Sequence, residues 1–410
     1  MRASLQQYWA PSYDGGGLLN LIASLGNVCG FTAPNSAWPY APLRGVDTAD
    51  WSRARNLVLV LADGVGAELI RRLSPTGFLC RHQVSTLTSV CPTTTAVAIP
   101  TLMTGLPPAV HGLTGWHVYL EEIDSVTAVL PLTVRGVHMA QGSVIDPGTL
   151  YSGPSLYSRL QRPSHVVTPV KIAYSPFSQI HAQGATLHAY LPPSRSWLDA
   201  LPFCRRKRDL FGTVRRLCNE PGEPRLIYAY WPDFDHAAHE SGVDSPSAVA
   251  LLHDFEQRLE ALMGQLHGTD STVIVTADHG FIDSPSEKQV HLSDHVALAK
   301  MLAHPVCGER RLAYCYLKPG TKEDFCDYIG TVFGDRMEAW PREKMLEEGW
   351  FGPGPVNDRL AGRIGDYVLA MKENWTLVDH VPGERPLRLV GVHGGLSRQE
   401  MMVPLCVASA

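Results

Sequence analysis

The sequence predicts an α/β fold with a central, mostly parallel sheet flanked by helices. Three short, continuous apolar runs, at residues 56–62, 225–231 and 271–277, are typical of strands that are buried on both faces of a parallel sheet. An acidic residue follows each run within two positions. Because ligands of open α/β sheets collect beyond the carboxyl ends of the strands, these acids predict one active-site edge.

The segments beside these runs supply the helices of the same fold. Residues 67–73 are predicted to form a helix, and residues 245–266 carry apolar side chains at helical spacing between the second and third runs. Such a strand-helix-strand unit makes a right-handed crossover between parallel strands. Farther along, the sequence predicts helices at 295–303 and 322–333 and strands at 311–317 and 366–372.

Between residues 115 and 223 the alternation of apolar strands and helices is lost, and Pro, Ser and Gly are frequent. We therefore expect a core formed by residues 1–114 and 224–410, with residues 115–223 inserted as a cap that recognises the substrate. The cap carries a basic patch, Arg205, Arg206, Lys207 and Arg208. A solvated surface is the first interpretation of this patch, and contact with an anionic substrate is the alternative.

The composition is that of an ordinary globular protein. The 410 residues, 45% of them hydrophobic, can bury a large core. A formal net charge of -5 gives no general attraction to nucleic acid polymers or anionic membranes, so the expected partner is a small molecule. Neither an export signal nor a membrane span is visible. The nine cysteines are scattered without a C-x-x-C pair, and we expect a cytoplasmic protein; a homodimer is left open.

Two pairs of residues have the chemistry of metal ligands. Asp278 and His279 are adjacent after the third run, whereas Asp235 and His239 lie four positions apart after the second run, near one another if this turn is helical. Taken alone, each pair is more often a loop or a helix cap. Their placement at successive strand ends, together with Asp63, is what favours a metal site.

The segment CPTTTAVAIPTLMTGL places three threonines at the predicted N-terminus of a helix. A hydroxyl there lies beside free backbone N–H groups and the positive end of the helix dipole, which favour an alkoxide and a bound phosphate. A capping role is the ordinary alternative for an isolated threonine run. The candidate metal ligands favour a catalytic role for the threonine segment over a capping role.

Five motifs in order resemble those of one family. LVLVLADGVG, P-T-x-T with T-G ten residues on, D-x-x-x-H, T-A-D-H-G and a late G-x-H-G-G are similar to the type I phosphodiesterase and nucleotide pyrophosphatase branch of the alkaline phosphatase superfamily. The motifs span residues 56–405, and the segment 115–223 shows no clear counterpart. The resemblance implies an alkaline phosphatase-like fold and a hydrolase that uses two metal ions.

By motif position, the resemblance implies two zinc ions, with manganese or iron as alternatives. Asp63, Asp278, His279 and the Thr95 oxygen would hold the first ion, and Asp235, His239 and His393 the second. Thr95 would be the nucleophile, because it is the second Thr of P-T-x-T. The neighbouring Asp233, His236 and Asp283 would not be ligands, and His111, His291 and His295 are interpreted as structural residues.

The function implied is hydrolysis of phosphodiester or phosphoanhydride bonds in nucleotide-linked or related small molecules, through a phosphothreonine intermediate. A phosphomonoesterase or phosphonate hydrolase on the same metals is the alternative, since P-P-A-V-H-G is similar to phosphonoacetate hydrolase. A non-catalytic metal-binding or nucleotide-binding protein is an alternative of another class. Three residues after Thr95, Ala98 offers no polar donor to a phosphate oxygen, from which we expect diesters to be preferred over monoesters.

Overall fold

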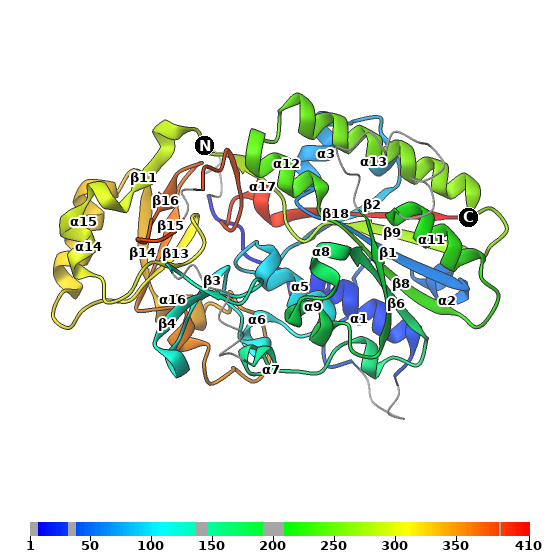
Figure 1. Ribbon diagram of the computed structural model, residues 1–410, viewed down its shortest axis with the longest axis horizontal. Helices are drawn as coiled ribbons and strands as arrows, with labels where there is room; N and C mark the ends of the chain where they lie inside the picture. Colours follow the sequence, from blue (N-terminus) through cyan, green and yellow to red (C-terminus); the bar gives the residue numbers. More distant parts are fainter. Residues whose placement is uncertain (1–6, 32–37, 137–145, 192–208, 385–386) are drawn as a thin grey trace.

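Two seven-stranded sheets lie side by side in the computed structural model, which describes residues 7–31, 38–136, 146–191, 209–384 and 387–410 (Figure 1). The first sheet has the strand order β2-β18-β9-β1-β8-β6-β7, and the second has the order β14-β15-β13-β12-β3-β4-β5. Helices cover the first sheet, which makes the α/β core that the sequence predicts.

The first sheet is mostly parallel, as expected. Its strands are β1 (Asn56–Ala62), β2 (Gln83–Thr88), β6 (Ser164–Pro169), β7 (Ala185–Tyr190), β8 (Arg225–Trp231), β9 (Ser271–Thr276) and β18 (Met402–Ser409). Parallel pairing joins β9, β1, β8, β6 and β7, while β18 is antiparallel to both β9 and β2. Every residue of β1 is buried, because this strand has neighbours on both sides and helices on both faces.

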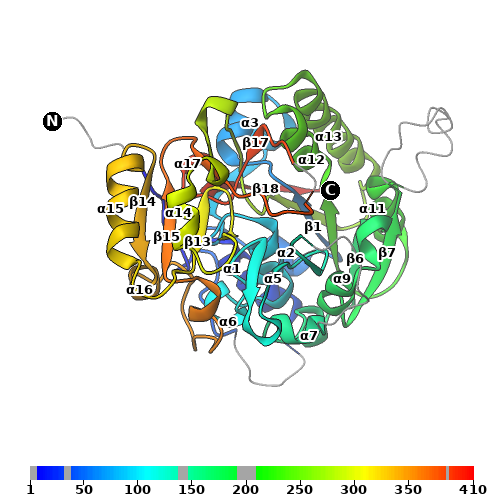
Figure 2. The same ribbon diagram turned by 60° about the vertical axis from the view of Figure 1, so that its left-hand side comes forward.

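Helices lie on both faces of the first sheet (Figures 1 and 2). One face carries α3 (Ala67–Leu73), α11 (Leu210–Asn219), α12 (Asp233–Ser241) and α13 (Pro246–Gln265), and the other carries α1 (Leu18–Cys29) and α5 (Thr95–Thr104). Helix α13 connects β8 to β9 across β1, so the predicted crossover is confirmed. Ser245 caps α13 by accepting a hydrogen bond from the Ala248 N–H.

The second sheet is antiparallel in the pairs that the structure describes. It consists of β3 (His117–Leu120), β4 (Ser125–Ala128), β5 (Thr133–Val134), β12 (Cys307–Gly308), β13 (Leu312–Cys315), β14 (Met337–Pro341) and β15 (Tyr367–Met371). Helices α14 (Val296–Met301), α15 (Lys322–Phe333) and α16 (Arg342–Glu347) accompany it. A hydrophobic cluster that includes Phe325, Phe333 and Leu369 packs α15 against β15.

Residues 115–223, expected to form one inserted cap, are divided between the two sheets. Strands β3, β4 and β5 belong to the second sheet, whereas β6 and β7 extend the first. Edge strand β7 has mostly half-exposed or exposed side chains, so its sequence lacks the continuous apolar run of a central strand. The predicted basic patch at 205–208 lies outside the described residues.

Short elements complete the described chain: α2 (Ala49–Arg53), α4 (Phe78–Arg81), α6 (Pro108–His111), α7 (Pro147–Leu150), α8 (Val170–Ala173), α9 (Pro176–His181), α17 (Arg398–Met401), β10 (Ile282–Asp283), β11 (Gln289–His291), β16 (Thr376–Val378) and β17 (Gly391–Val392). Among the described helices, none is both long and apolar enough to cross a membrane.

Candidate active site

The first cluster of candidate ligands lies at the carboxyl edge of the first sheet. Asp63 follows β1, and Asp278 and His279 follow β9, the neighbouring parallel strand, so the register brings the three side chains together. His279 Nε2 lies 3.4 Å from Asp63 Oδ1 and 3.5 Å from Asp278 Oδ2. All three side chains are buried, and one potential ligand atom of each lies within 4.8 Å of the others.

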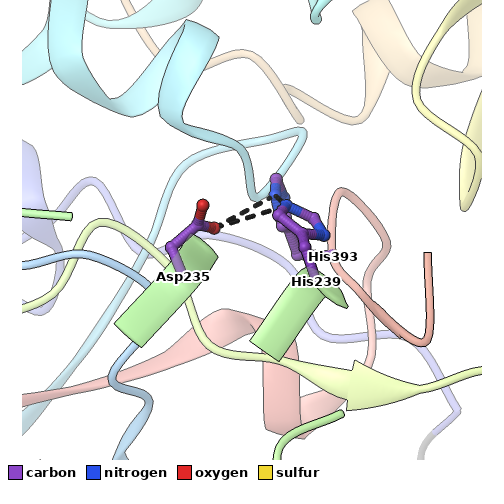
Figure 3. Close-up of side chains that lie close together, drawn as sticks. All are labelled: Asp235, His239 and His393. Carbon is purple, nitrogen blue, oxygen red and sulfur yellow. Dashed lines mark hydrogen bonds and ion pairs between the residues drawn. The ribbon is translucent and has the colours of Figure 1, made fainter. Parts of the chain in front are cut away.

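The second cluster comes from α12 and the loop after β17 (Figure 3). Asp235 and His239 occupy positions i and i+4 of α12, which places them on one face of the helix. His239 Nε2 lies 3.4 Å from Asp235 Oδ1, and His393 Nε2 lies 3.7 Å from the same oxygen and 3.2 Å from His239 Nε2. Figure 3 shows the three polar groups directed toward one point.

The two clusters are adjacent. The imidazole rings of His279 and His393 stack with their centroids 3.8 Å apart and an interplanar angle of 19°. The charge of Asp235 also contributes to raising the pKa of Asp63, which belongs to the other cluster. The six side chains predicted as ligands therefore lie in one continuous site.

Thr95 is the first residue of α5 and points at the first cluster. Its Oγ1 lies 3.1 Å from His279 Nε2. The preceding Thr94 is extended at the N-cap, and the helix ends at Gly105 with a φ of 64°, where an added Cβ would lie 1.9 Å from the Trp38 ring. The T-G motif therefore marks the end of the helix that presents Thr95.

All three histidines of the site are oriented in the same way. The Nδ1 atom of His239 lies 2.9 Å from the Gly391 carbonyl oxygen, that of His279 3.0 Å from the Gly280 carbonyl, and that of His393 3.1 Å from the Thr93 carbonyl. A donated Nδ1–H leaves Nε2 as the free lone pair, which is how metal-binding histidines are held. Burial lowers the pKa of His239 to about 4, so its ring is neutral at physiological pH.

The carboxylates of the site lie within ion-pair distance of histidine rings, and no Lys or Arg of the described residues forms an ion pair with them. Burial raises the pKa of Asp63 well above its ordinary value, and the charges of Asp278 and Asp235 raise it further. Burial and then Asp278 likewise raise the pKa of Asp235. The oxygens that face the clusters are buried, and none has a hydrogen-bond partner among the described residues: Asp63 Oδ1, Asp235 Oδ1 and Asp278 Oδ2. A cation in each cluster would satisfy these oxygens, and an Asp/His donor set suits zinc, manganese or iron.

The loop that carries His393 is fastened from two sides. Thr93 Oγ1 donates to the Gly395 carbonyl at 2.8 Å, which ties the loop to the threonine segment. On the other side, Glu400 Oε1 accepts a hydrogen bond from the Gly395 N–H at 2.8 Å. Glu400 is completely buried and pairs with Arg311 of the second sheet, with Nε···Oε1 3.0 Å and Nη2···Oε2 3.1 Å. The second sheet thus helps to position a ligand of the first.

The residues expected to stand apart from the site have other partners. Asp233 accepts a hydrogen bond from Trp231 Nε1, and Asp283 accepts one from the Val243 N–H. His236 is exposed and lies 3.6 Å from Glu240. Buried His111 contacts Thr101 Oγ1 through Nε2, and His295 Nδ1 contacts the Tyr328 hydroxyl; His291 belongs to β11.

Ala98 is fully buried and belongs to the large hydrophobic cluster of the first sheet. An alanine here offers no polar donor, and the expected preference for diesters stays a prediction.

Sequence reasoning missed three groups around the ligands. The Tyr230 hydroxyl donates to Asp63 Oδ2, while Glu400 and its partner Arg311 support the His393 loop. Tyr230 lies in the same apolar run that predicts β8. Because side chains alternate between the two faces of a strand, its position near the strand end was the signal that could have identified it. The other groups depend on partners that are distant in sequence.

The sequence and the fold are similar to those of known proteins. The family model for type I phosphodiesterase / nucleotide pyrophosphatase matches residues 57–396. No curated protein matches the sequence. Murine ectonucleotide pyrophosphatase / phosphodiesterase 5 has a similar structure, with a TM-score of 0.61 and 17% identity over 85% of this chain and 87% of that one. An inactive form of that protein has been solved in complex with AMP.

A second kind of relative is phosphonoacetate hydrolase from Sinorhizobium meliloti 1021, solved in complex with phosphonoformate. Its TM-score is 0.58 at 19% identity, covering 87% of this chain and 90% of that one. These structural likenesses show a shared fold. Because the family model spans most of the chain, the protein belongs to the type I phosphodiesterase / nucleotide pyrophosphatase family, a family of phosphoric ester hydrolases.

Proposed function

We propose that this protein is a two-metal hydrolase of phosphodiester or phosphoanhydride bonds in small molecules, with nucleotide-linked compounds as the favoured substrates. The observation that carries the proposal is the position of the Thr95 hydroxyl, 3.1 Å from His279 Nε2 and beside two clusters of ligand-type side chains. Nucleotide-linked substrates are inferred from the family and from the AMP complex of the murine relative.

The residues present fit two divalent ions, and zinc is the proposed metal. Asp63, Asp278, His279 and the Thr95 oxygen would hold the first, and the second would be held by Asp235, His239 and His393. When bound, two such ions lower the pKa of a hydroxyl and offset the negative charge of the phosphoryl oxygens and the leaving alkoxide.

The chain itself supplies the nucleophile and its orientation. Thr95 loses its hydroxyl proton to solvent, and Oγ1 attacks phosphorus as the bond to the leaving alkoxide breaks, which gives a phosphothreonine. Thr95 is the first residue of α5, and the free N–H groups of this helix terminus would favour an anion bound there. Water then attacks phosphorus from the opposite side, Oγ1 departs, and Thr95 regains its proton.

A phosphonate hydrolase is the second candidate. The observation in its favour is that phosphonoacetate hydrolase shares the fold over nearly the same share of the chain as the ectonucleotide relatives. A non-catalytic protein on the same scaffold would retain the ligands while lacking turnover. The three alternatives can therefore be distinguished by substrate, because the first cleaves a phosphodiester or phosphoanhydride, the second cleaves a phosphonate and the third cleaves neither.

Metal analysis and kinetics test the proposal. We expect about two equivalents of divalent metal per chain, hydrolysis of bis(4-nitrophenyl) phosphate, and loss of activity after chelation that added zinc restores. Phosphonoacetate cleavage without diester cleavage would support the second candidate. Undiminished turnover in a metal-free sample would refute the two-metal reaction.

A further inference from the structure

The Phe281 side chain lies between the segments that carry the predicted ligands. Phe281 follows ligand His279 by two residues and precedes β10, and it is only 3% exposed. Strand β10 pairs with β17 in antiparallel register, with Ile282 opposite Val392. Continued by one residue, this register places Phe281 opposite ligand His393.

The aromatic ring of Phe281 contacts the imidazole rings of all three histidines of the site. The Phe281 ring centroid lies 4.9 Å from that of His239, 5.1 Å from that of His393 and 5.6 Å from that of His279. The interplanar angles are 72°, 73° and 54°, so the first two contacts are T-shaped. Aromatic rings at such distances and angles attract one another beyond the burial of their surface. Because His279 belongs to the first cluster and the other two histidines to the second, one side chain contacts both clusters.

Two glycines leave the space that the Phe281 ring occupies. A Cβ added to Gly64, which directly follows ligand Asp63, would lie 2.5 Å from Phe281 Cε2. A Cβ added to Gly391 would lie 3.2 Å from Phe281 Cδ1, and the Gly391 carbonyl oxygen lies 2.9 Å from His239 Nδ1. The ring therefore packs against the backbone that follows Asp63 and against the backbone that orients His239.

These contacts complete the orientation of the histidines. A hydrogen bond from Nδ1 to a carbonyl fixes the tautomer of an imidazole, but a single bond of this kind still permits the ring to turn about it. A neighbouring ring that packs against the imidazole restricts this rotation, and so it holds Nε2 in the direction of the ligand cluster. The ends of β1 and β9, helix α12 and the loop after β17 carry the six Asp and His ligands, and all four segments meet at Phe281.

We propose that Phe281 is a positioning residue, which holds the imidazoles of both clusters in the orientation that metal binding requires and so links the two metal positions. This inference rests on the proposed two-metal site. It differs from the support that the Glu400 side chain gives to the His393 loop, because that support concerns the second cluster, whereas Phe281 contacts both.

Zinc release from the holoenzyme measures this role without turnover. Wild-type protein and the variant Phe281→Leu, each loaded with zinc, would be mixed with a chromogenic zinc chelator, and the release of both equivalents would be followed by absorbance. Leucine keeps an apolar side chain in the core but removes the ring from all three histidines. We expect both zinc ions to be released about tenfold faster or more, because lost support of metal ligands costs about tenfold to a hundredfold in metal affinity.

Two further variants keep the test specific. Phe325→Leu makes the same substitution at a fully buried phenylalanine in a hydrophobic cluster of the second sheet, and it should lower Tm while both zinc release rates stay unchanged. Phe281→Met retains a flexible side chain whose sulfur can contact aromatic rings, so its release rates should lie between those of the wild type and Phe281→Leu. Circular dichroism and Tm would show that each variant is folded.

The possible outcomes separate this inference from the proposed function. A folded Phe281→Leu variant that releases both ions at wild-type rates, or only one of them faster, would refute a role at both clusters, and so would an equal acceleration in Phe325→Leu. If Phe281→Leu does not fold, wild-type release rates in Phe281→Met would refute the role instead. A wild-type protein that binds two zinc ions but cleaves no phosphodiester or phosphonate would refute the proposed function, whereas the release rates would still decide the role of Phe281.

Discussion

Replacing Arg311 with methionine tests how the second sheet supports the site. The Arg311 side chain is 1% exposed and pairs with a Glu400 side chain that is 0% exposed. Arg311 also donates to the Trp375 and Glu373 carbonyls at 2.6 and 2.8 Å. Removing one partner leaves a buried charge without compensation, so Arg311→Met should lower the free energy of unfolding by about 3–5 kcal/mol.

A double variant separates this stability effect from the positioning effect. Arg311→Met with Glu400→Leu removes both charges, and replacing a buried pair by apolar side chains restores most of the lost stability. The Gly395 N–H still loses its acceptor Glu400, however, so the His393 loop keeps its hydrogen bond to Thr93 but loses the one to Glu400. Loss of such outer support costs about tenfold to a hundredfold in metal affinity, which we expect at the second cluster.

Denaturant unfolding of the metal-free protein would measure the first effect, and calorimetric titration with zinc would measure the second. Ser245→Ala, which removes the cap of α13 and leaves Arg311 and Glu400 in place, controls for general destabilisation and should leave both zinc affinities unchanged. If the double variant folds stably and binds two zinc ions with wild-type affinity, the ion pair does not position His393 and the reasoning is wrong.

Three further predictions concern the site and its surroundings. His393→Ala should retain the fold but bind one metal fewer, by elemental analysis, and retention of both would remove His393 from the ligand set. Thr95→Ala should lower kcat by several orders of magnitude while the variant still binds substrate, whereas Thr94→Ala should lower kcat much less. Comparable losses in the two variants would indicate that Thr94 is the nucleophile. Burial lowers the pKa of His111 from 6.5 to about 3, so the unfolded chain binds a proton that the folded chain excludes between these values. The contribution of neutral His111 to the free energy of unfolding is complete above pH 6.5 and decreases as the pH is lowered, by about 2 kcal/mol near pH 5. His111→Gln should therefore make Tm decline less steeply on acidification, and an unchanged slope of Tm against pH would contradict this.

The sequence was most informative where residues that can bind a metal directly follow a buried strand. Asp63 and Asp278 end continuous apolar runs, and parallel pairing of β1 and β9 makes their convergence predictable without any contact being known. Asp235 and His239 were recognisable by their helical spacing. In contrast, nothing local distinguishes His393 from other loop histidines, and only the resemblance of its motif to the family identified it.

Other parts of the fold were hidden because their stabilising partners lie far away in the chain. Strand β7 is an edge strand with mostly half-exposed or exposed side chains, so residues 185–190 show no continuous apolar pattern and the sequence places them in a cap. Arg311 lies in the turn between β12 and β13 of the second sheet, and its role depends on Glu400, which is distant in the sequence. Sequence spacing carries no signal for such contacts.

The origin of the second cluster has a consequence for biosynthesis. Asp235 and His239 come from one helix, but the third member of the cluster, His393, follows β17 near the C-terminal end of the sequence. During translation, a nascent chain that has already formed α12 has only two of these three side chains. The complete cluster arises only after the loop that follows β17 has been synthesised and has folded against α12. An ion held by all three side chains would therefore bind only after residue 393 has been added to the chain.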